Sequence, residues 1–328
     1  MKSLASLPLF ILGLIVKFSG SDVTRQINNN ENFSAIMTKI NQSSLVGRGI
    51  ISVSGSDARV FLQGLISNDM NKVSTDYSIY AAFLSPQGKY LYDFFIMQKE
   101  GSFLIDCELH RLRDLLNQLK LFKLRSDIVL SDCSHKFQIT AIWGDLAVKK
   151  IKSKLTPGVT EHIKNDIVII DPRTEHAGLR VISQFQTGDV ENSNEVNFPH
   201  YDLHRISLGL TDGSRDLFIN KTILLEANFD KLNGVDWEKG CYLGQEVTAR
   251  SKYRGLVKKR FVGVHVSNLE PQEGMIIMKD DTNVGEIRST QGNYGIALLR
   301  VDSISDNNPL TLERNGVVTT RPQKWFKV

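Results

Sequence analysis

Apolar residues in the first half of the chain occur at two spacings, one typical of strands and one typical of helices. Four short apolar runs indicate β-strands, at 47–53, 79–84, 90–97 and 103–106. The turn-forming residues 85–88 join the second run to the third. Segments 57–65 and 110–120 instead repeat apolar residues every three or four positions, which predicts amphipathic helices, and Ser56 is expected to cap the first of them.

A second cycle of similar elements begins near Phe137. The pattern predicts a strand there, a helix around 146–155, and strands at 167–170 and 179–182. Because strand-rich segments alternate with single helices, we expect α+β halves and not a parallel Rossmann sheet. Neither a GxGxxG sequence nor a Walker loop occurs, so nucleotide binding through those loops is not expected.

After Gly255, short strands separated by glycines continue to the end of the chain without a convincing helix, which predicts a small antiparallel barrel. The expected fold class is therefore α+β, with a body of two α+β halves (37–135 and 136–255) and a C-terminal β-barrel at 256–328. We expect residues 1–36 to form an N-terminal extension outside the fold.

The apolar run 7–16 in this extension follows Lys2, as in a secretory signal, but is too short for a confident membrane span. An alternative is that the natural start is Met37. No stable membrane insertion is expected.

Charge and cysteine content narrow the class of protein. A net charge of +4 is too small to indicate nucleic-acid binding by itself. The three cysteines (Cys107, Cys133 and Cys241) are widely spaced, which argues against a disulfide framework and for a reducing compartment, predicted to be the cytoplasm. No Cys-x-x-Cys pair is present, so cysteines alone do not build an iron–sulfur or zinc site.

The octet at 239–246, KGCYLGQE, places one thiol between two glycines just before a predicted helix at 245–252. The positive end of the helix dipole and the neighbouring Lys239 both favour the thiolate of Cys241, which is the reactive form. The alternative is an inert cysteine buried in a tight turn, which is the commoner fate of cysteine.

This octet resembles the signature of the YgfZ-type folate-binding proteins, which are relatives of the T-protein (aminomethyltransferase) of the glycine cleavage system. Further segments resemble the family motifs in the family order: 61–69, 82–93, 171–173, 225–228 and 250–260. The resemblance implies a T-protein-like folate-binding body, a tetrahydrofolate cofactor, and a role in maintaining iron–sulfur enzymes, including those that modify tRNA. It also assigns the reactive thiol to Cys241, with Lys239 beside it.

Glu226, in the sequence Leu-Leu-Glu-Ala-Asn, matches the glutamate that reads the pterin ring in the T-protein family. A carboxylate suits this role because it accepts two parallel N–H donors, as it does from arginine. The alternative is a glutamate on a helix surface. The resemblance also makes Asn68, Asp69 and Tyr242 candidate cofactor-binding residues.

The segment 250–260 carries six basic residues and no acidic one. Such a run is usually a solvated face. It also suits the carboxylates of a folate glutamyl tail, for which Arg250 and Arg254 are the candidates nearest the octet. RNA backbone is a third alternative because Tyr253 lies among the charges, but direct nucleic-acid binding is not expected.

Two departures from the aminomethyltransferase pattern bear on catalysis. Segment 171–178 does not reproduce the glycine-rich loop of those enzymes, and Asp114 fits their functional aspartate poorly. The leading hypothesis is therefore a monomeric, cytoplasmic tetrahydrofolate-binding protein without classical turnover, whose partners are iron–sulfur client or assembly proteins. The alternative is a folate-dependent one-carbon (aminomethyl) transferase. His200 and His204 have a metal-ligand spacing, but no metal is expected, since a pair of surface histidines is the commoner case.

Overall fold

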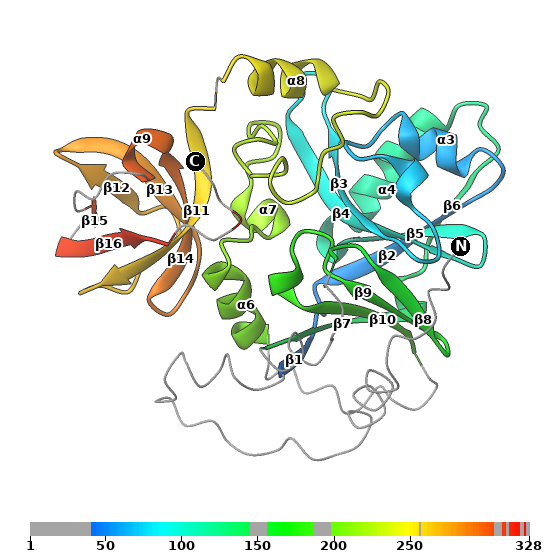
Figure 1. The fold of residues 1–328 in the computed structure, drawn as a ribbon, viewed down its shortest axis with the longest axis horizontal. Helices are drawn as coiled ribbons and strands as arrows, with labels where there is room; N and C mark the ends of the chain where they lie inside the picture. The colour runs from blue at the N-terminus through cyan, green and yellow to red at the C-terminus, as the bar shows by residue number, and fades with distance from the viewer. Residues whose placement is uncertain are drawn as a thin grey trace.

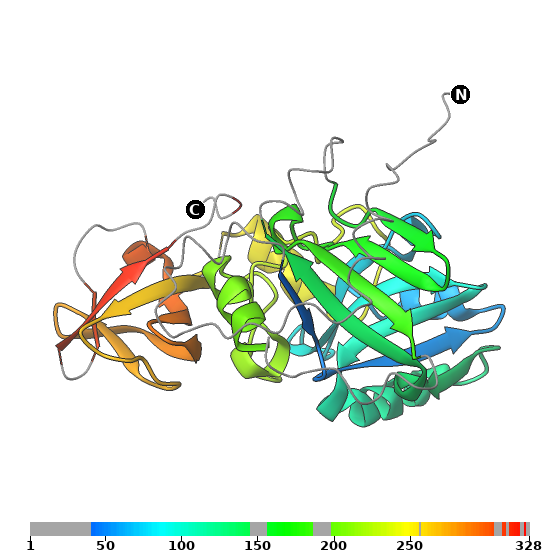
Figure 2. The same cartoon turned by 90° about the horizontal axis from the view of Figure 1, so that it is seen from below.

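The computed structural model describes residues 41–144, 156–185, 198–255, 257–304, 310–312, 315–321 and 325, which form two five-stranded sheets and a closed barrel (Figure 1). The barrel lies at one end of the molecule and the two sheets lie at the other (Figure 2). Helices α6 (Phe198–Ser207) and α7 (Gly213–Asp216) lie between them. The extension 1–36 and the helix predicted around 146–155 fall outside the described residues.

The first sheet confirms the strands predicted in the N-terminal half. Its order is β3 (Ile79–Leu84), β4 (Tyr90–Lys99), β5 (Ser102–Glu108), β2 (Arg48–Ser54) and β6 (Val129–Asp132), with every neighbouring pair antiparallel. Helix α4 (Leu109–Lys123) covers one face through Leu112, Leu115 and Leu119, as its apolar spacing predicts.

Helix α3 (Ala58–Gln63) packs into the same core as α4, but its cap differs from the prediction. The N-cap residue is Asp57, and no side chain caps the helix. Ser56 instead donates its hydroxyl to Asp127 Oδ2 at 2.9 Å. The backbone N–H of Asp127 donates to Asp57 Oδ2 at 2.7 Å, so these side chains tie the start of α3 to the loop before β6.

The second sheet has the order β1 (Asn41–Ser44), β7 (Phe137–Trp143), β10 (Leu179–Gln184), β9 (Asp166–Ile170) and β8 (Thr160–Ile163). Strand β1 pairs with β7, although it directly precedes β2 of the first sheet in the sequence. The chain therefore crosses between the sheets at residues 45–47. Apolar residues of both sheets, among them Tyr80, Phe95, Ile139 and Ile167, form one shared core.

The barrel closes in the order β11 (Lys259–Ser267), β14 (Tyr294–Arg300), β13 (Thr282–Gln291), β12 (Ile276–Lys279), β15 (Leu310–Leu312) and β16 (Gly316–Thr320). Every neighbouring pair is antiparallel, which confirms the predicted barrel and the α+β class. The expectation that this region lacks a helix is wrong, because the short helix α9 (Val301–Ile304) follows β14. The remaining described elements are helix α8 (Gln245–Tyr253) and three short 3-10 turns, η1 (Met70–Lys72), η2 (Ser134–Lys136) and η3 (Glu175–Ala177).

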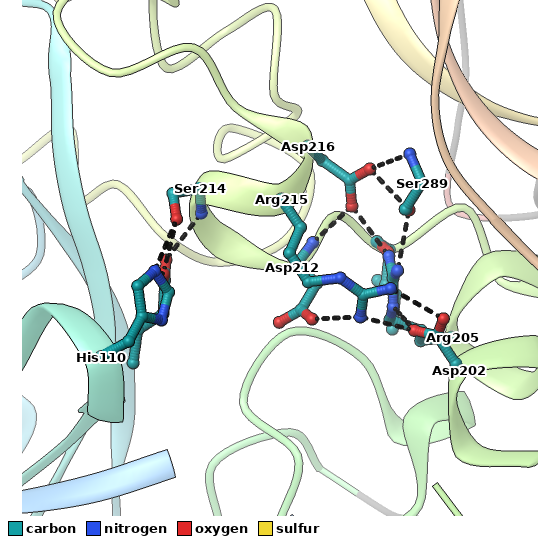
Figure 3. A network of polar contacts seen from close by, with 10 residues as sticks. His110, Asp202, Arg205, Asp212, Ser214, Arg215, Asp216 and Ser289 are labelled. Atoms are coloured by element: carbon teal, nitrogen blue, oxygen red, sulfur yellow. Dashed lines mark hydrogen bonds and ion pairs between the residues drawn. The ribbon is translucent and has the colours of Figure 1, made fainter. Parts of the chain in front are cut away.

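A buried polar network joins the barrel to the body (Figure 3). Asp216 of α7 accepts hydrogen bonds from the backbone N–H and the hydroxyl of Ser289 on β13, at 3.0 and 2.6 Å. Arg205 of α6 donates to Asp216 Oδ2 at 2.8 Å and to Ser289 Oγ at 2.7 Å. Since all three side chains are buried, the contact between barrel and body has defined geometry.

Candidate functional site

The three cysteines lie in different environments. Cys241 is exposed, Cys133 is half-buried, and Cys107 is buried within β5. Burial raises the pKa of the Cys107 thiol, which keeps it protonated and unreactive. Among the three, Cys241 is therefore the thiol that a partner or reagent reaches most readily, and the buried alternative for Cys241 does not hold.

The glycines around Cys241 have different roles. Gly244 has a left-handed backbone (φ 80°) and immediately precedes helix α8 (Gln245–Tyr253), close to the predicted 245–252. A Cβ atom at Gly244 would lie 2.5 Å from the carbonyl oxygen of Ser85. The turn before β4 and the start of α8 thus pack closely, and glycine is required at this contact. Gly240 has open space around it.

Lys239 is buried, and its ammonium group bonds to backbone carbonyls of the N-terminal half. Nζ donates to the backbone carbonyls of three residues, Gln63 at 2.9 Å and Ile66 and Asn68 at 2.7 Å each. Burial lowers the pKa of Lys239 to about 8, a shift that the nearby carboxylates of Asp69 and Asp236 oppose. The three carbonyl acceptors favour the charged form, so they also oppose the effect of burial.

Glu226 is half-buried beside the barrel. Its Oε2 accepts the backbone N–H of Ile223 at 3.1 Å, and within the described part of the chain Oε1 accepts no hydrogen bond. Burial raises the pKa of Glu226, which the Ile223 N–H and the charges of Lys89 and Lys259 partly oppose. This carboxylate therefore retains the capacity to accept hydrogen bonds from a ligand.

A pocket of about 390 Å³ lies where the barrel meets the segment after α7. Its lining includes Phe218, Lys221, Lys259 and Glu286. The charge of Lys259 also lowers the pKa of Glu226, so the pocket and this carboxylate belong to the same region of the molecule.

The two candidate arginines lie on or beside α8 and are exposed. Arg250 pairs with Glu246 at 2.5 Å, which is the expected i,i+4 pairing on a helix surface. Arg254 is the C-cap residue of α8, and no ion pair forms on its side chain within the described ranges. Nearby, Lys252 Nζ lies 3.7 Å from the ring centroid of Trp237, which attaches the last turn of α8 to the chain that leads to Cys241.

The remaining candidates already have partners within the protein. Asn68 is buried and donates its side-chain amide to the carbonyls of Tyr80 and Asn233. Asp69 caps η1 by accepting the backbone N–H of Asn71 at 2.9 Å. Tyr242 is buried under the Lys239 ammonium, 5.0 Å from its ring centroid, and burial raises its pKa to about 12. Their predicted roles in cofactor binding stay predictions.

A buried acidic cluster in the first sheet was not predicted as a site. Asp93 accepts hydrogen bonds from the phenol groups of Tyr80 and Tyr90 at 2.8 and 2.7 Å. Burial raises the pKa of Asp93, as does the nearby Glu108, whereas the two phenols oppose the shift. The available signal was an aspartate within an apolar strand, since such a residue is rarely buried without a specific partner.

A cluster of three guanidinium groups around Phe95 was also missed. Arg180, Arg173 and Arg48 lie 3.9, 5.1 and 5.6 Å from the centroid of this ring. Arg48 and Arg180 each donate to Asp106 at 2.7 Å, and Arg173 pairs with Asp171 at 2.8 Å. The predicted 171–173 motif therefore contributes a buried ion pair at the interface of the two sheets.

The sequence suggested that the two histidines of α6 form a surface pair, and this prediction is wrong. His204 is buried and stacks on Trp143, with the ring centroids 5.4 Å apart. No group of three or more His, Cys, Asp or Glu side chains suited to hold a metal ion occurs among the described residues.

Comparison with known proteins first defines the fold class. A solved structure of glycine cleavage system aminomethyltransferase T from Bartonella henselae superposes with a TM-score of 0.69 over 89% of this chain and 87% of that chain, at 14% sequence identity. Residues 258–327 match the family described as CAF17, C-terminal beta-barrel domain. The molecule is therefore a T-protein-like α+β protein with a C-terminal barrel.

Sequence relatives identify the family within this class. The chain is 30% identical over 316 residues to the iron–sulfur cluster assembly factor IBA57, mitochondrial, of Mus musculus, covering 86% of this chain and 84% of the relative. It is 37% identical over 230 residues to the IBA57 homolog of Mycosarcoma maydis, covering 66% of this chain and 54% of that relative. The chain belongs to the IBA57 family of iron–sulfur cluster assembly factors. It spans about half the length of the fungal relatives from Mycosarcoma maydis and Neurospora crassa.

These comparisons confirm the predicted link to iron–sulfur cluster assembly and the T-protein-like fold. The YgfZ-type branch, folate binding and tRNA modification stay predictions. The cytoplasmic prediction is contradicted, because the relatives from mouse, human and Mycosarcoma maydis are named as mitochondrial. Of the helices that the structure describes, none is long and apolar enough to cross a membrane.

Proposed function

We propose that this chain is a mitochondrial factor that supports the assembly or repair of iron–sulfur enzymes through the thiol of Cys241. The observation that carries the proposal is the exposure of Cys241 on a loop held at both ends, in a chain that belongs to the IBA57 family. A thiolate is the form of cysteine that binds metal or attacks a sulfur or carbon centre. Enzymes that modify tRNA are among the proposed clients.

Replacing the thiol tests this role. In cells that lack this protein, Cys241→Ser is expected to abolish rescue of a radical iron–sulfur enzyme, because a hydroxyl is a far weaker ligand and nucleophile at neutral pH. Cys133→Ser, at a half-buried cysteine outside the octet, is the matched control and is expected to restore activity. The measurements are the activity of that enzyme, the level of a tRNA modification made by an iron–sulfur enzyme, and the activity of a cluster-free enzyme as reference. Full rescue by Cys241→Ser would contradict the proposal.

Tetrahydrofolate binding is the second part of the proposal, with Glu226 as the group that reads the pterin. The half-buried carboxylate has one oxygen without an internal partner in the described residues, which suits the N–H edge of a pterin. The likeness of the fold to an aminomethyltransferase supports a folate ligand only as an analogy. When bound, the folate supplies a carrier for a one-carbon unit.

Titration calorimetry tests the folate assignment. Glu226→Ala is expected to weaken tetrahydrofolate binding by about 1.5–3 kcal/mol, the usual worth of hydrogen bonds to a charged group. Glu238→Ala is the matched control, since Glu238 is exposed and lies outside the half-buried site. Equal affinity of the wild-type protein and Glu226→Ala would remove Glu226 from the site.

A further inference from the structure

The octet that contains Cys241 is attached to one short stretch of the N-terminal half. We call residues 236–244 the Cys241 loop and residues 63–68 the platform, which comprises the end of α3 and the turn after it. Three backbone carbonyls of the platform converge on the single ammonium nitrogen of Lys239, at 2.7 to 2.9 Å. An ammonium group has three donors, so this arrangement uses all of them.

Two backbone hydrogen bonds attach the same loop on either side of the thiol. The N–H of Asp236 donates to the carbonyl of Ser67 at 3.0 Å, and the N–H of Leu243 donates to that of Gly64 at 3.1 Å. Cys241 lies between these points, so both ends of the loop are bonded to the same short segment. Lys239 adds the side-chain attachment between them.

The carboxylate of Asp236 shapes the chain where it enters Lys239. Its Oδ1 accepts the backbone N–H groups of Glu238 and Lys239 at 2.7 and 2.9 Å. Its Oδ2 pairs with Lys72 of η1 at 2.6 Å. The turn before Lys239 is therefore defined by side-chain bonds, and the lysine side chain is directed into the platform.

The ammonium of Lys239 and the thiol of Cys241 differ in their exposure to solvent. Lys239 is 7% exposed, whereas Gly240 and Cys241 are exposed. Within the described part of the chain, no hydrogen bond joins the ammonium to the thiol. Burying an ammonium is costly unless every donor has an acceptor. Since all three donors of Lys239 are bonded inside the protein, the ammonium has a structural role and is not a charge presented at the surface.

We propose that Lys239 is a positioning residue whose ammonium locks the Cys241 loop onto the platform, so that the exposed thiol is presented in one fixed place to a cluster-bearing partner. The inference rests on the proposed function, in which Cys241 is the working thiol. It differs from a role in activating the thiol, because the ammonium bonds to the backbone carbonyls of the platform, which is far away in the sequence.

The shape of the acceptor set provides a sharp test. Three carbonyls converge on one nitrogen, which suits a compact ammonium and not a planar guanidinium with its donors spread over three nitrogens. Lys239→Arg therefore keeps the positive charge but is expected to lose the lock. Lys239→Met keeps the length and removes both charge and donors.

Loop motion is measured with a nitroxide on Cys241, in full-length protein carrying Cys133→Ser. Cys107 is buried and does not compete for the label. Both Lys239→Met and Lys239→Arg are expected to shorten the rotational correlation time of the label about threefold, into the nanosecond range of free loops. Lys231→Met, at an exposed lysine outside the loop, is the matched control and is expected to leave it unchanged. An unchanged spectrum for Lys239→Met overturns the lock, and a locked spectrum for Lys239→Arg overturns its geometric basis.

Because Lys239→Met leaves buried carbonyls unpaired, the variant is also checked for a cooperative thermal transition. Asp236→Ala is the second variant if Lys239→Met fails to fold, since Asp236 is only partly buried and its loss removes the side-chain bonds that direct Lys239 into the platform. It is expected to raise label mobility in the same direction. If its label stays as immobile as in the wild-type protein, the proposed lock is wrong.

Cell rescue separates this proposal from the function on which it rests. If Cys241→Ser fails to rescue and both Lys239 variants also fail while remaining folded, the positioning role is supported. If the unlabelled Lys239 variants rescue fully despite mobile loops, the positioning role is overturned and the role of Cys241 stands. Full rescue by Cys241→Ser instead overturns the proposed function, whatever the spectra show.

Discussion

Lys239 and Cys241 are two positions apart, yet their side chains lie in opposite environments. The ammonium is enclosed by platform carbonyls, and the thiol is exposed. The sequence predicts both groups at one reactive centre because that prediction rests only on their proximity along the chain. Burial and hydrogen bonding decide which of two neighbouring polar groups is available to a partner. The same principle applies to His204, which the sequence places on the surface and the fold places under Trp143.

The burial of His204 predicts a loss of stability in acid. Burial lowers its pKa from 6.5 to about 4, although the backbone groups of Ala177 and His176 oppose the shift. Between these two pH values the unfolded chain takes up a proton that the folded chain does not. The contribution of His204 to stability is therefore complete above pH 6.5 and is lost as the pH falls towards 4, up to about 3 kcal/mol.

His204→Phe keeps the ring stack on Trp143 and removes the titrating group. Urea unfolding at pH 7 and pH 4.5 is expected to show a smaller loss for this variant than for the wild-type protein, by about 2–3 kcal/mol. His162→Phe, at an exposed histidine of β8, is the control and is expected to lose as much as the wild-type protein. Equal losses in His204→Phe and the wild-type protein would exclude His204 as the cause.

At the scale of elements, α8 combines two of the predicted features. Its first residue follows Gly244 and its last turn contacts Trp237, so it lies against the loop that carries Cys241. The predicted basic run begins on this helix, and its exposed charges include Arg250. The surface position of the Arg250–Glu246 pair agrees with a solvated face and leaves the glutamyl-tail role as a prediction.

Two measurements distinguish these roles for Arg250 and Arg254. As a surface pair, Arg250–Glu246 is expected to contribute less than about 1 kcal/mol to stability, so Arg250→Gln has little effect on unfolding. If both arginines hold a glutamyl tail, the double change to Gln weakens the binding of polyglutamylated folate more than that of monoglutamylated folate. It also reduces the salt dependence of binding. Equal losses for the two ligands would identify a solvated face. Arg113→Gln with Lys120→Gln, at exposed positions of α4, is the control pair.

For the whole molecule, the contact between body and barrel includes a network of buried charges. Asp216 accepts bonds from Ser289 of the barrel and from Arg205 of α6, and Arg205 also pairs with Asp202 at 2.6 Å (Figure 3). Buried charges of this kind fix geometry because no other arrangement satisfies them as well. The pocket near Glu226 lies at the same boundary, so its shape depends on the contact.

Asp216→Asn is expected to lower the free energy of unfolding by about 3 kcal/mol, because it removes one partner of a buried ion pair. The barrel is also expected to unfold at a lower denaturant concentration than the body, which appears as a second transition in urea. Asp302→Asn is the control, since Asp302 pairs with Arg300 at an exposed site of the barrel. A single transition at the wild-type midpoint would show that the network does not couple the two parts.

Much of the fold could be predicted because local patterns specify it. Strands β2, β3 and β4, helix α4 and the barrel follow from period-2 or helical spacing and from turn residues, all of which act over a few positions. The octet likewise indicated the exposed thiol and the family function. The compartment was mispredicted because three unpaired cysteines indicate reducing conditions and do not distinguish one reducing compartment from another.

By itself, the sequence determined strands β2 to β5, helix α4, the order of the α+β body and the barrel, and the position of the candidate thiol. Only the tertiary structure decided that β1 joins the second sheet and that three guanidinium groups lie around Phe95. It also decided that Lys239 bonds to a platform more than 170 positions away. The physical reason is that spacing encodes which face of an element is apolar. The partner of a buried polar group depends instead on which distant segments the closed core brings within hydrogen-bonding distance.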